Sequence, residues 1–341
     1  MSVNKKIKEI VLSAKEELAK AESEKDLVTI IDKVIALDYP LKYDNTVQWS
    51  VGTAFAATSV PLYFYFLEVT NYFLLAHYFM LACPLIVAAS FFGYALMRTN
   101  SVSELSDEIF KMDLIFDNKL KPIKTRIGKG YAKKLKGQFC EFDRGNYSRE
   151  ISFLAEGNYD NNGCKLPYDY YSFHYVNQRT EVVVTSNGKG GTTTSTRTVY
   201  DHFHRYGIMF DHNAASSVMI CSSTPLSKLE QKFEPASLKF RKEFSVTCAD
   251  QMEASKLTKP TVVLKFEEMA DEFDGLNFEA SENGRACLSV RNNLMGVTRK
   301  AGLEYAISFK EEIEQNNQLK KLDKLLSFAV FINDKTDNNF K

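Results

Sequence analysis

Histidines in the second half of the chain have the spacing most suggestive of chemistry. His202 and His204 are two residues apart in a segment of strand-like alternation, so both imidazoles are expected on one face. His212 follows eight residues later, and His174 lies across a predicted hairpin. Two imidazoles on one face with a third nearby can hold zinc or a non-haem metal ion. The sequence therefore offers His202, His204 and His212 as candidate metal ligands.

The same strand has a second interpretation. Its face continues through Tyr206, Ile208 and Phe210, which is the pattern of an ordinary aromatic strand. Further possible ligands are Asp201, Asp211 and Cys221, but their spacing does not require a metal. The aromatic-strand interpretation is favoured. The sequence lacks a GxSxG elbow, an HExxH motif and a glycine-rich phosphate loop between strand and helix. It identifies no catalytic residue and predicts no cofactor.

A long apolar stretch runs from Trp49 to Met97 and contains a single charge, Glu68. A membrane-spanning helix needs about 20 apolar residues. Trp49–Leu67 supplies one span and Tyr72–Met97 a second, with residues 68–71 as the turn. A hydrophobic hairpin inside a soluble core is disfavoured because two such runs leave no polar face for water. The sequence predicts a transmembrane hairpin.

Lysine and arginine residues predict the orientation of this hairpin. The turn has neither, whereas Lys42 precedes the first span and Arg98 follows the second. The positive-inside rule then places both termini and the C-terminal domain in the cytoplasm. A basic run without acidic residues follows: Lys119, Lys121, Lys124, Arg126, Lys129, Lys133, Lys134 and Lys136. We expect it to contact anionic lipid headgroups, at about 1 kcal/mol per cation near the surface. A solvated helix face is the alternative.

Composition excludes some classes of protein. The 341 residues carry a formal net charge of zero, which argues against nucleic acid as a partner because phosphate binding needs a basic excess. Six cysteines are scattered without a CxxC pair. This predicts reduced thiols, with neither a disulfide framework nor a zinc knuckle.

Hydrophobic periodicity gives the order of the elements. Two amphipathic helices are expected before the hairpin, the second one capped by Ser23, and a further helix at 103–121 is expected to end at Pro122. Strands are predicted at 151–157, 168–185, 196–211, 217–222, 238–245, 276–280 and 285–291, with helices at 259–273 and 305–332. A flexible tip at 185–195 joins the two longest strands.

These elements predict an α+β protein, a transmembrane α-hairpin followed by a cytosolic mixed, largely antiparallel β domain with flanking helices. The expected divisions are a helical N-terminal segment at 1–45, the hairpin at 46–98, a helical and basic connector at 99–145 and the α+β domain at 146–335.

Three stretches carry a resemblance to a known family. They are Thr196–Asp211 (TRTVYDHFHRYGIMFD), the segment Phe240–Pro260, and a closing helix from about Leu303. With the hairpin, they resemble an uncharacterised family of bacterial membrane-anchored proteins known only as a domain of unknown function. Ser255 stands where that pattern has an Arg. The resemblance implies a multi-pass protein of the bacterial inner membrane with a cytosolic α+β domain, and it brings no catalytic residues.

The expected function is that of a non-enzymatic binding or scaffold protein that presents its α+β domain at the inner membrane. Its expected partners are the lipid bilayer and another protein or a second copy of itself. The alternative is a membrane-anchored metal-dependent hydrolase that uses the His202 and His204 face. A small oligomeric channel lined by His77 and Glu68 is less favoured, because neither span has a polar stripe.

Overall fold

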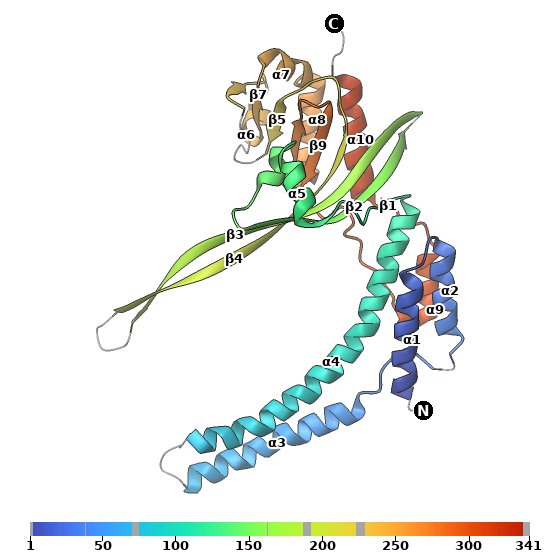
Figure 1. The fold of residues 1–341 in the computed structure, drawn as a ribbon, viewed down its shortest axis with the longest axis vertical. Helices are drawn as coiled ribbons and strands as arrows, with labels where there is room; N and C mark the ends of the chain where they lie inside the picture. Colours follow the sequence, from blue (N-terminus) through green and yellow to red (C-terminus); the bar gives the residue numbers. More distant parts are fainter. Residues whose placement is uncertain are drawn as a thin grey trace. The chain divides into compact units, whose positions relative to one another are not determined.

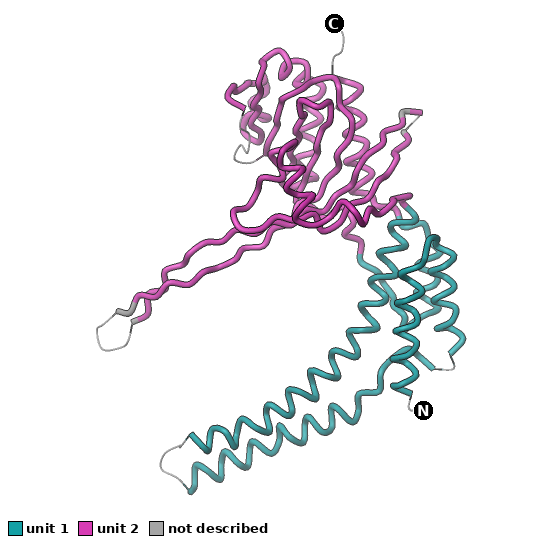
Figure 2. The backbone as a smooth tube through the Cα atoms, in the orientation of Figure 1, with its two compact units in different colours: residues 1–117, 298–317 teal, residues 118–297, 318–341 magenta. Residues whose placement is uncertain are grey.

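The computed structural model describes residues 3–37, 39–69, 75–161, 163–186, 192–222 and 229–336. They form helices and one antiparallel sheet, which confirms the predicted α+β class. The chain divides into two compact units (Figure 2). Unit 1 contains residues 1–117 and 298–317, and unit 2 contains residues 118–297 and 318–341.

Unit 1 is helical (Figure 1). Its elements are α1 (Val3–Leu18), α2 (Glu24–Ile35), α3 (Thr46–Val69), α4 (Leu75–Asp117), η2 (Leu303–Tyr305) and α9 (Ala306–Ile313). The two predicted N-terminal amphipathic helices are confirmed, since their buried residues follow the apolar stripes. Ser23 immediately precedes α2, and its backbone N–H donates to the Asp26 carboxylate at 3.0 Å.

Helices α3 and α4 are both long and apolar enough to cross a membrane, which gives weak support for membrane association. Most of their apolar side chains are exposed within the chain, as lipid-facing residues would be. Of the predicted turn, Glu68 and Val69 belong to α3, whereas residues 70–74 lie outside the described residues.

The separate helix predicted at 103–121 is wrong in its bounds. Helix α4 continues without a break from the second apolar segment to Asp117, because no Gly or Pro interrupts residues 98–117. It ends before Lys119, whose φ of 53° is left-handed. The twenty residues after Met97 add about 30 Å of helix beyond the apolar segment.

Unit 2 contains a nine-stranded antiparallel sheet with the strand order β1-β2-β3-β4-β9-β8-β5-β7-β6. The strands are β1 (Lys121–Pro122), β2 (Ser148–Asn161), β3 (Cys164–Ser186), β4 (Thr192–Asp211), β5 (Val218–Cys221), β6 (Gln231–Phe233), β7 (Ser245–Cys248), β8 (Asn277–Ala280) and β9 (Arg285–Val290). The helices are α5 (Gly128–Lys136), η1 (Cys140–Asp143), α6 (Leu238–Glu243), α7 (Gln251–Leu257), α8 (Pro260–Glu272) and α10 (Lys320–Lys335).

Helices cover the sheet on both faces. On one face, α5 and η1 pack Leu135 and Phe142 against Tyr171 and Phe173 of β3. On the other face, Phe278 of β8 meets Phe266 of α8, and Phe266 in turn contacts Phe328 of α10, with ring centroids 6.3 and 4.9 Å apart. Aromatic packing of this kind holds a sheet between two helical layers.

Two predicted elements are corrected in this part of the chain. Residues 238–245 were expected as a strand, but α6 occupies 238–243, capped by the Ser237 hydroxyl, which accepts from Phe240 N at 3.2 Å. The single helix expected at 305–332 is two helices, α9 and α10. The polar residues 315–318 lie between these two helices. The Asn317 side chain there donates a hydrogen bond to Asp113 of α4 at 3.0 Å.

Strands β3 and β4 continue past their neighbours (Figure 1). The register of β3 with β2 ends at Val176, and that of β4 with β9 begins at Tyr206. Between Asn177↔Asp201 and Ser186↔Thr192 the two strands pair with each other over ten positions, a ribbon of about 33 Å. We call this ribbon the β-arm. The central residues of its predicted tip, 187–191, lie outside the described residues.

Asp113 is an ionisable residue buried in unit 1, on the part of α4 after Met97. Its Oδ2 accepts from Asn317 Nδ2 at 3.0 Å, whereas Oδ1 has no hydrogen-bond partner among the described residues. Burial raises the pKa of Asp113 to about 7 against the effect of this hydrogen bond, and the charges of Asp117, Glu24 and Glu312 raise it further.

Asp113→Asn is expected to stabilise the protein at pH 8 and to do so much less at pH 4. The folded-state pKa exceeds the unfolded value of 3.8, so stability falls as the pH rises from about 4 to 7. The loss is at most about 4 kcal/mol, and an amide keeps the acceptor for Asn317 without the charge. Thermal unfolding of both forms at the two pH values measures this. A variant less stable than the parent at pH 8 would contradict the assignment.

Candidate functional site

Histidines and a carboxylate form a connected group on one face of β2, β3 and β4. Glu150, His174 and His204 occupy directly opposed positions on the three strands. His174 Nδ1 lies 3.0 Å from Glu150 Oε1, and His174 Nε2 lies 3.0 Å from His202 Nδ1. The His174 and His204 rings stack with centroids 4.7 Å apart. The cluster lies at the base of the β-arm.

This cluster contains two of the three candidate metal ligands. His202 and His204 share a face as the spacing predicted, but both ring nitrogens of His174 already have hydrogen-bond partners. Within the described residues, no group of three His, Cys, Asp or Glu side chains is arranged to hold a metal ion. The geometry instead provides a short hydrogen-bonded chain from Glu150 through His174 to His202.

His212 does not join the cluster. It lies eight residues beyond His204, about 27 Å along an extended chain. Its ring is buried against Phe278, and its Nδ1 lies 2.6 Å from Asn333 Oδ1. Burial lowers the pKa of His212 despite this hydrogen bond, so a neutral ring is favoured. His212 therefore has the environment of a core residue.

The other suggested ligands are also separated. Asp201 pairs with Arg179 on the β-arm at 2.6 Å, and the Cys221 thiol is buried on β5. The Asp211 carboxylate lies near Arg285, with Oδ1 3.7 Å from Nε.

The eight predicted lipid-contact residues are exposed and follow one another through β1 and α5. Ala132 and Leu135 of α5 face the core, which directs the lysines of that helix outward. Lys136 pairs with Asp143 at 2.7 Å, and Arg126 lies 3.7 Å from Glu156. This basic surface is exposed within the chain, and it could contact either solvent or anions.

A buried charged network, which the sequence analysis did not single out, joins η1 to the sheet. The Glu141 carboxylate, 1% exposed, accepts from Arg205 Nε of β4 at 2.6 Å and from both Arg144 Nε and Nη2 at 3.0 Å. Asn277 Nδ2 of β8 donates to the same carboxylate at 3.1 Å, and Arg205 Nη2 donates to Ser289 at 2.7 Å. Burial would raise the pKa of Glu141, but the two guanidinium groups outweigh it and hold it at about 2.

Glu279 lies next to this network. Its carboxylate accepts from the backbone N–H groups of Cys140 and Glu141 at 2.7 and 3.2 Å. Burial raises the pKa of Glu279 to about 7 against these hydrogen bonds, and the charge of Glu141 adds to the rise. Neighbouring carboxyl groups with pKa values so far apart resemble an acid–base pair. Because both are less than 10% exposed, we interpret them as elements of the core. The sequence signal for this network is Arg205, which interrupts the inward apolar positions of β4.

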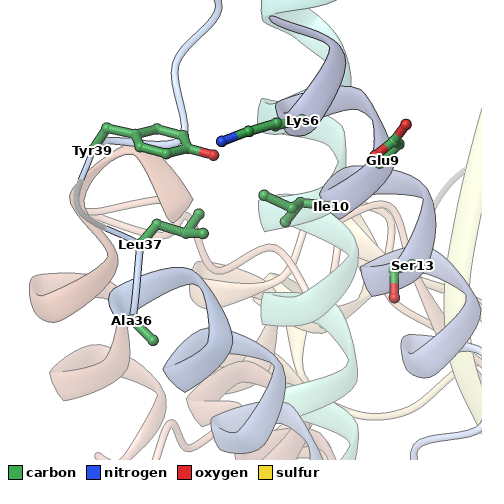
Figure 3. A pocket seen from close by; sticks show the side chains of 7 residues that line it. All are labelled: Lys6, Glu9, Ile10, Ser13, Ala36, Leu37 and Tyr39. Atoms are coloured by element: carbon green, nitrogen blue, oxygen red, sulfur yellow. The ribbon is translucent and has the colours of Figure 1, made fainter. Parts of the chain in front are cut away.

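Unit 1 contains an open depression of about 520 Å³ beside α1 and the C-terminal end of α2 (Figure 3). Lys6 and Tyr39 point toward each other across it, above Ile10 and Leu37. Among the described lining residues, which are mixed in character, Glu9 is the one carboxylate, and no acid and base are brought together around a reacting position.

Comparisons with protein-family models, curated proteins and solved structures found no match to this chain. The resemblance to an uncharacterised membrane-anchored family therefore stays a prediction.

Arg205→Ala is expected to destabilise the protein by about 3–5 kcal/mol, because it leaves a buried carboxylate undercompensated. The matched control is Arg197→Ala, which removes an exposed ion pair with Glu181 and should cost far less. Chemical unfolding of both variants, followed by circular dichroism, measures the difference. Equal costs would contradict a structural role for the buried network.

His204 is expected to titrate below the ordinary value of 6.5. Partial burial lowers its pKa most, and the neighbouring His174 and His202 lower it further. His174→Ala removes one of these charges and should raise the pKa of His204. NMR titration of the imidazole C–H signals measures both values. An unchanged His204 pKa in the variant would contradict the stacked arrangement.

Proposed function

We propose that this protein is a membrane-anchored binding or scaffold protein, without catalytic activity, that uses the β-arm to hold a protein partner. The observation that carries the proposal is the ten-pair ribbon that β3 and β4 form beyond the rest of the sheet. A ribbon of this length adds nothing to the core, which favours a role in recognition.

The backbone edges of the β-arm support binding of an extended chain. Beyond Gln178 on β3 and before Tyr206 on β4, no other described strand pairs with the ribbon. The outward N–H and C=O groups of such edges can add a strand from a partner. The backbone of Gln178 is not free to add a strand. Its N–H donates to Asn146 Oδ1 at 2.7 Å, and its C=O accepts from Asn146 Nδ2 at 3.0 Å.

Side chains of the β-arm make it a preformed element. Arg179 pairs with Asp201 and Arg197 pairs with Glu181 across the two strands, at 2.6 and 2.7 Å. Such cross-strand pairs favour the paired form of the ribbon. A preformed ribbon loses less conformational entropy on binding than a flexible loop.

Anchoring is the second part of the proposal. Helices α3 and α4 would cross the bacterial inner membrane, with both termini and unit 2 on the cytoplasmic side. The support is the pair of long apolar helices and the Lys and Arg residues that flank them. The exposed basic residues from Lys119 to Lys136 would then contact anionic headgroups.

Shortening the β-arm tests the function. Replacing residues 180–198 by Asn-Gly closes the hairpin with a two-residue turn and retains every strand pair of the sheet beneath it. We expect unchanged thermal unfolding but loss of the proteins that the tagged parent retains in mild detergent, identified by mass spectrometry. Full retention of those proteins by the shortened variant would refute the proposal.

A further inference from the structure

The two faces of the β-arm differ sharply in charge. Alternation along the paired strands places four uncharged side chains from each strand on one face, which we call the neutral face. It consists of Gln178, Thr180, Val182 and Val184 from β3 and Thr194, Thr196, Thr198 and Tyr200 from β4. The opposite face carries Arg179, Glu181, Arg197 and Asp201, which pair among themselves.

The neutral face is exposed and regular. Val182 and Val184 are 62% and 61% exposed, and Tyr200 is 45% exposed. β-Branched side chains dominate it, and they pack well against another pleated surface. At the base of the arm, the Tyr147 ring contacts Tyr200, with centroids 4.8 Å apart.

The absence of charged side chains limits which partners can bind this face. A partner recognised through salt bridges would bind the opposite face, where the charges are, although these are already paired within the arm. The neutral face favours a surface that is itself uncharged and has the spacing of a β-ribbon. A second β-arm has both properties, and two copies related by a two-fold axis bring no like charges together.

The size of the contact fits an association that depends on the membrane. A ribbon of about 33 Å by roughly 10 Å offers about 330 Å² per copy, well below the ~800 Å² per partner of a standard interface. Such a contact is weak between freely diffusing molecules. Copies held in one bilayer meet at a raised effective concentration, which compensates for weak individual contacts.

We propose that the neutral face of the β-arm binds the neutral face of a second copy of this chain. This inference rests on the proposed binding function and names the partner. The Thr hydroxyls can donate and accept across the interface, and the valines are removed from water.

Site-directed cross-linking of the full-length chain in membranes tests this inference. Thr196→Cys lies on the neutral face, and the control Ser195→Cys lies next to it on the opposite face; both positions are exposed. Both variants also carry Cys83→Ser, because Cys83 is an exposed thiol. A short thiol-reactive cross-linker should join two copies of the Thr196 variant at several times the yield of the Ser195 variant. Equal yields, or no dimer from either variant, would overturn the inference.

Charge insertion provides a second test. Val184→Glu places a carboxylate on the neutral face, and Thr185→Glu places one on the opposite face one residue away. Added to the Thr196→Cys variant, the first substitution is expected to lower the cross-linked yield in membranes at least tenfold, and the second to leave it unchanged. Equal effects of both substitutions would overturn a face-specific contact.

The outcomes separate this inference from the function on which it rests. A chain that stays monomeric, but whose shortened-arm variant loses another captured protein, contradicts the second copy as partner and leaves the binding function standing. A shortened arm that alters neither capture nor oligomeric state contradicts both.

Discussion

Burial of one carboxylate determines much of the arrangement of unit 2. Glu141 cannot remain charged inside the protein without compensation, because removing an ion from water costs several kcal/mol. Arg205 from β4, Arg144 beside η1 and Asn277 from β8 supply that compensation. A single carboxylate thus joins η1 to two strands that are separated in the sheet by β9.

The same contact determines which way the β-arm faces. Side chains alternate along a strand, so the inward direction of Arg205 turns His204 and His202 to the other face. The alternation continues along β4 through Tyr200 to the three threonines that β4 contributes to the neutral face. A slip of one residue would exchange the neutral and charged faces, and it would remove Arg205 from Glu141. The cost of losing the buried Arg205–Glu141 contact therefore holds the register of the β-arm, up to eleven residues away. The β-arm also gains from its attachment, since an isolated two-stranded hairpin is at best marginally stable in water.

Much of this fold follows from sequence patterns that reflect local physics. The stripes of α1 and α2, the cap at Ser23 and the long alternating strands were predictable because burial and alternation act within a few residues of each other. The sequence-based predictions were wrong where contacts between residues far apart in the chain determine the local structure. Residues 238–243 form a helix, in which Phe240 contacts the following Phe244 and both rings pack against Phe266.

The candidate site was only partly predictable. Two histidines on one strand face could be inferred from their spacing, and His174 was expected across the hairpin. The place of His212 could not be inferred, because its partner Asn333 is 121 residues away. Glu141 and Arg205 are likewise 64 residues apart. The sequence around Glu141 does not indicate which arginine it pairs with. The β-arm was anticipated as two long strands, but not its projection beyond β2 and β9, which depends on where those neighbours end.

Amide hydrogen exchange of the β-arm tests the central claim that it is the binding element. The full-length chain would be compared in membranes from cells that produce it and as purified monomer in detergent. If the β-arm binds a partner, residues 177–186 and 192–201 should exchange more slowly in the membranes, with the sheet beneath unchanged. Equally fast exchange of the β-arm in both preparations would contradict it.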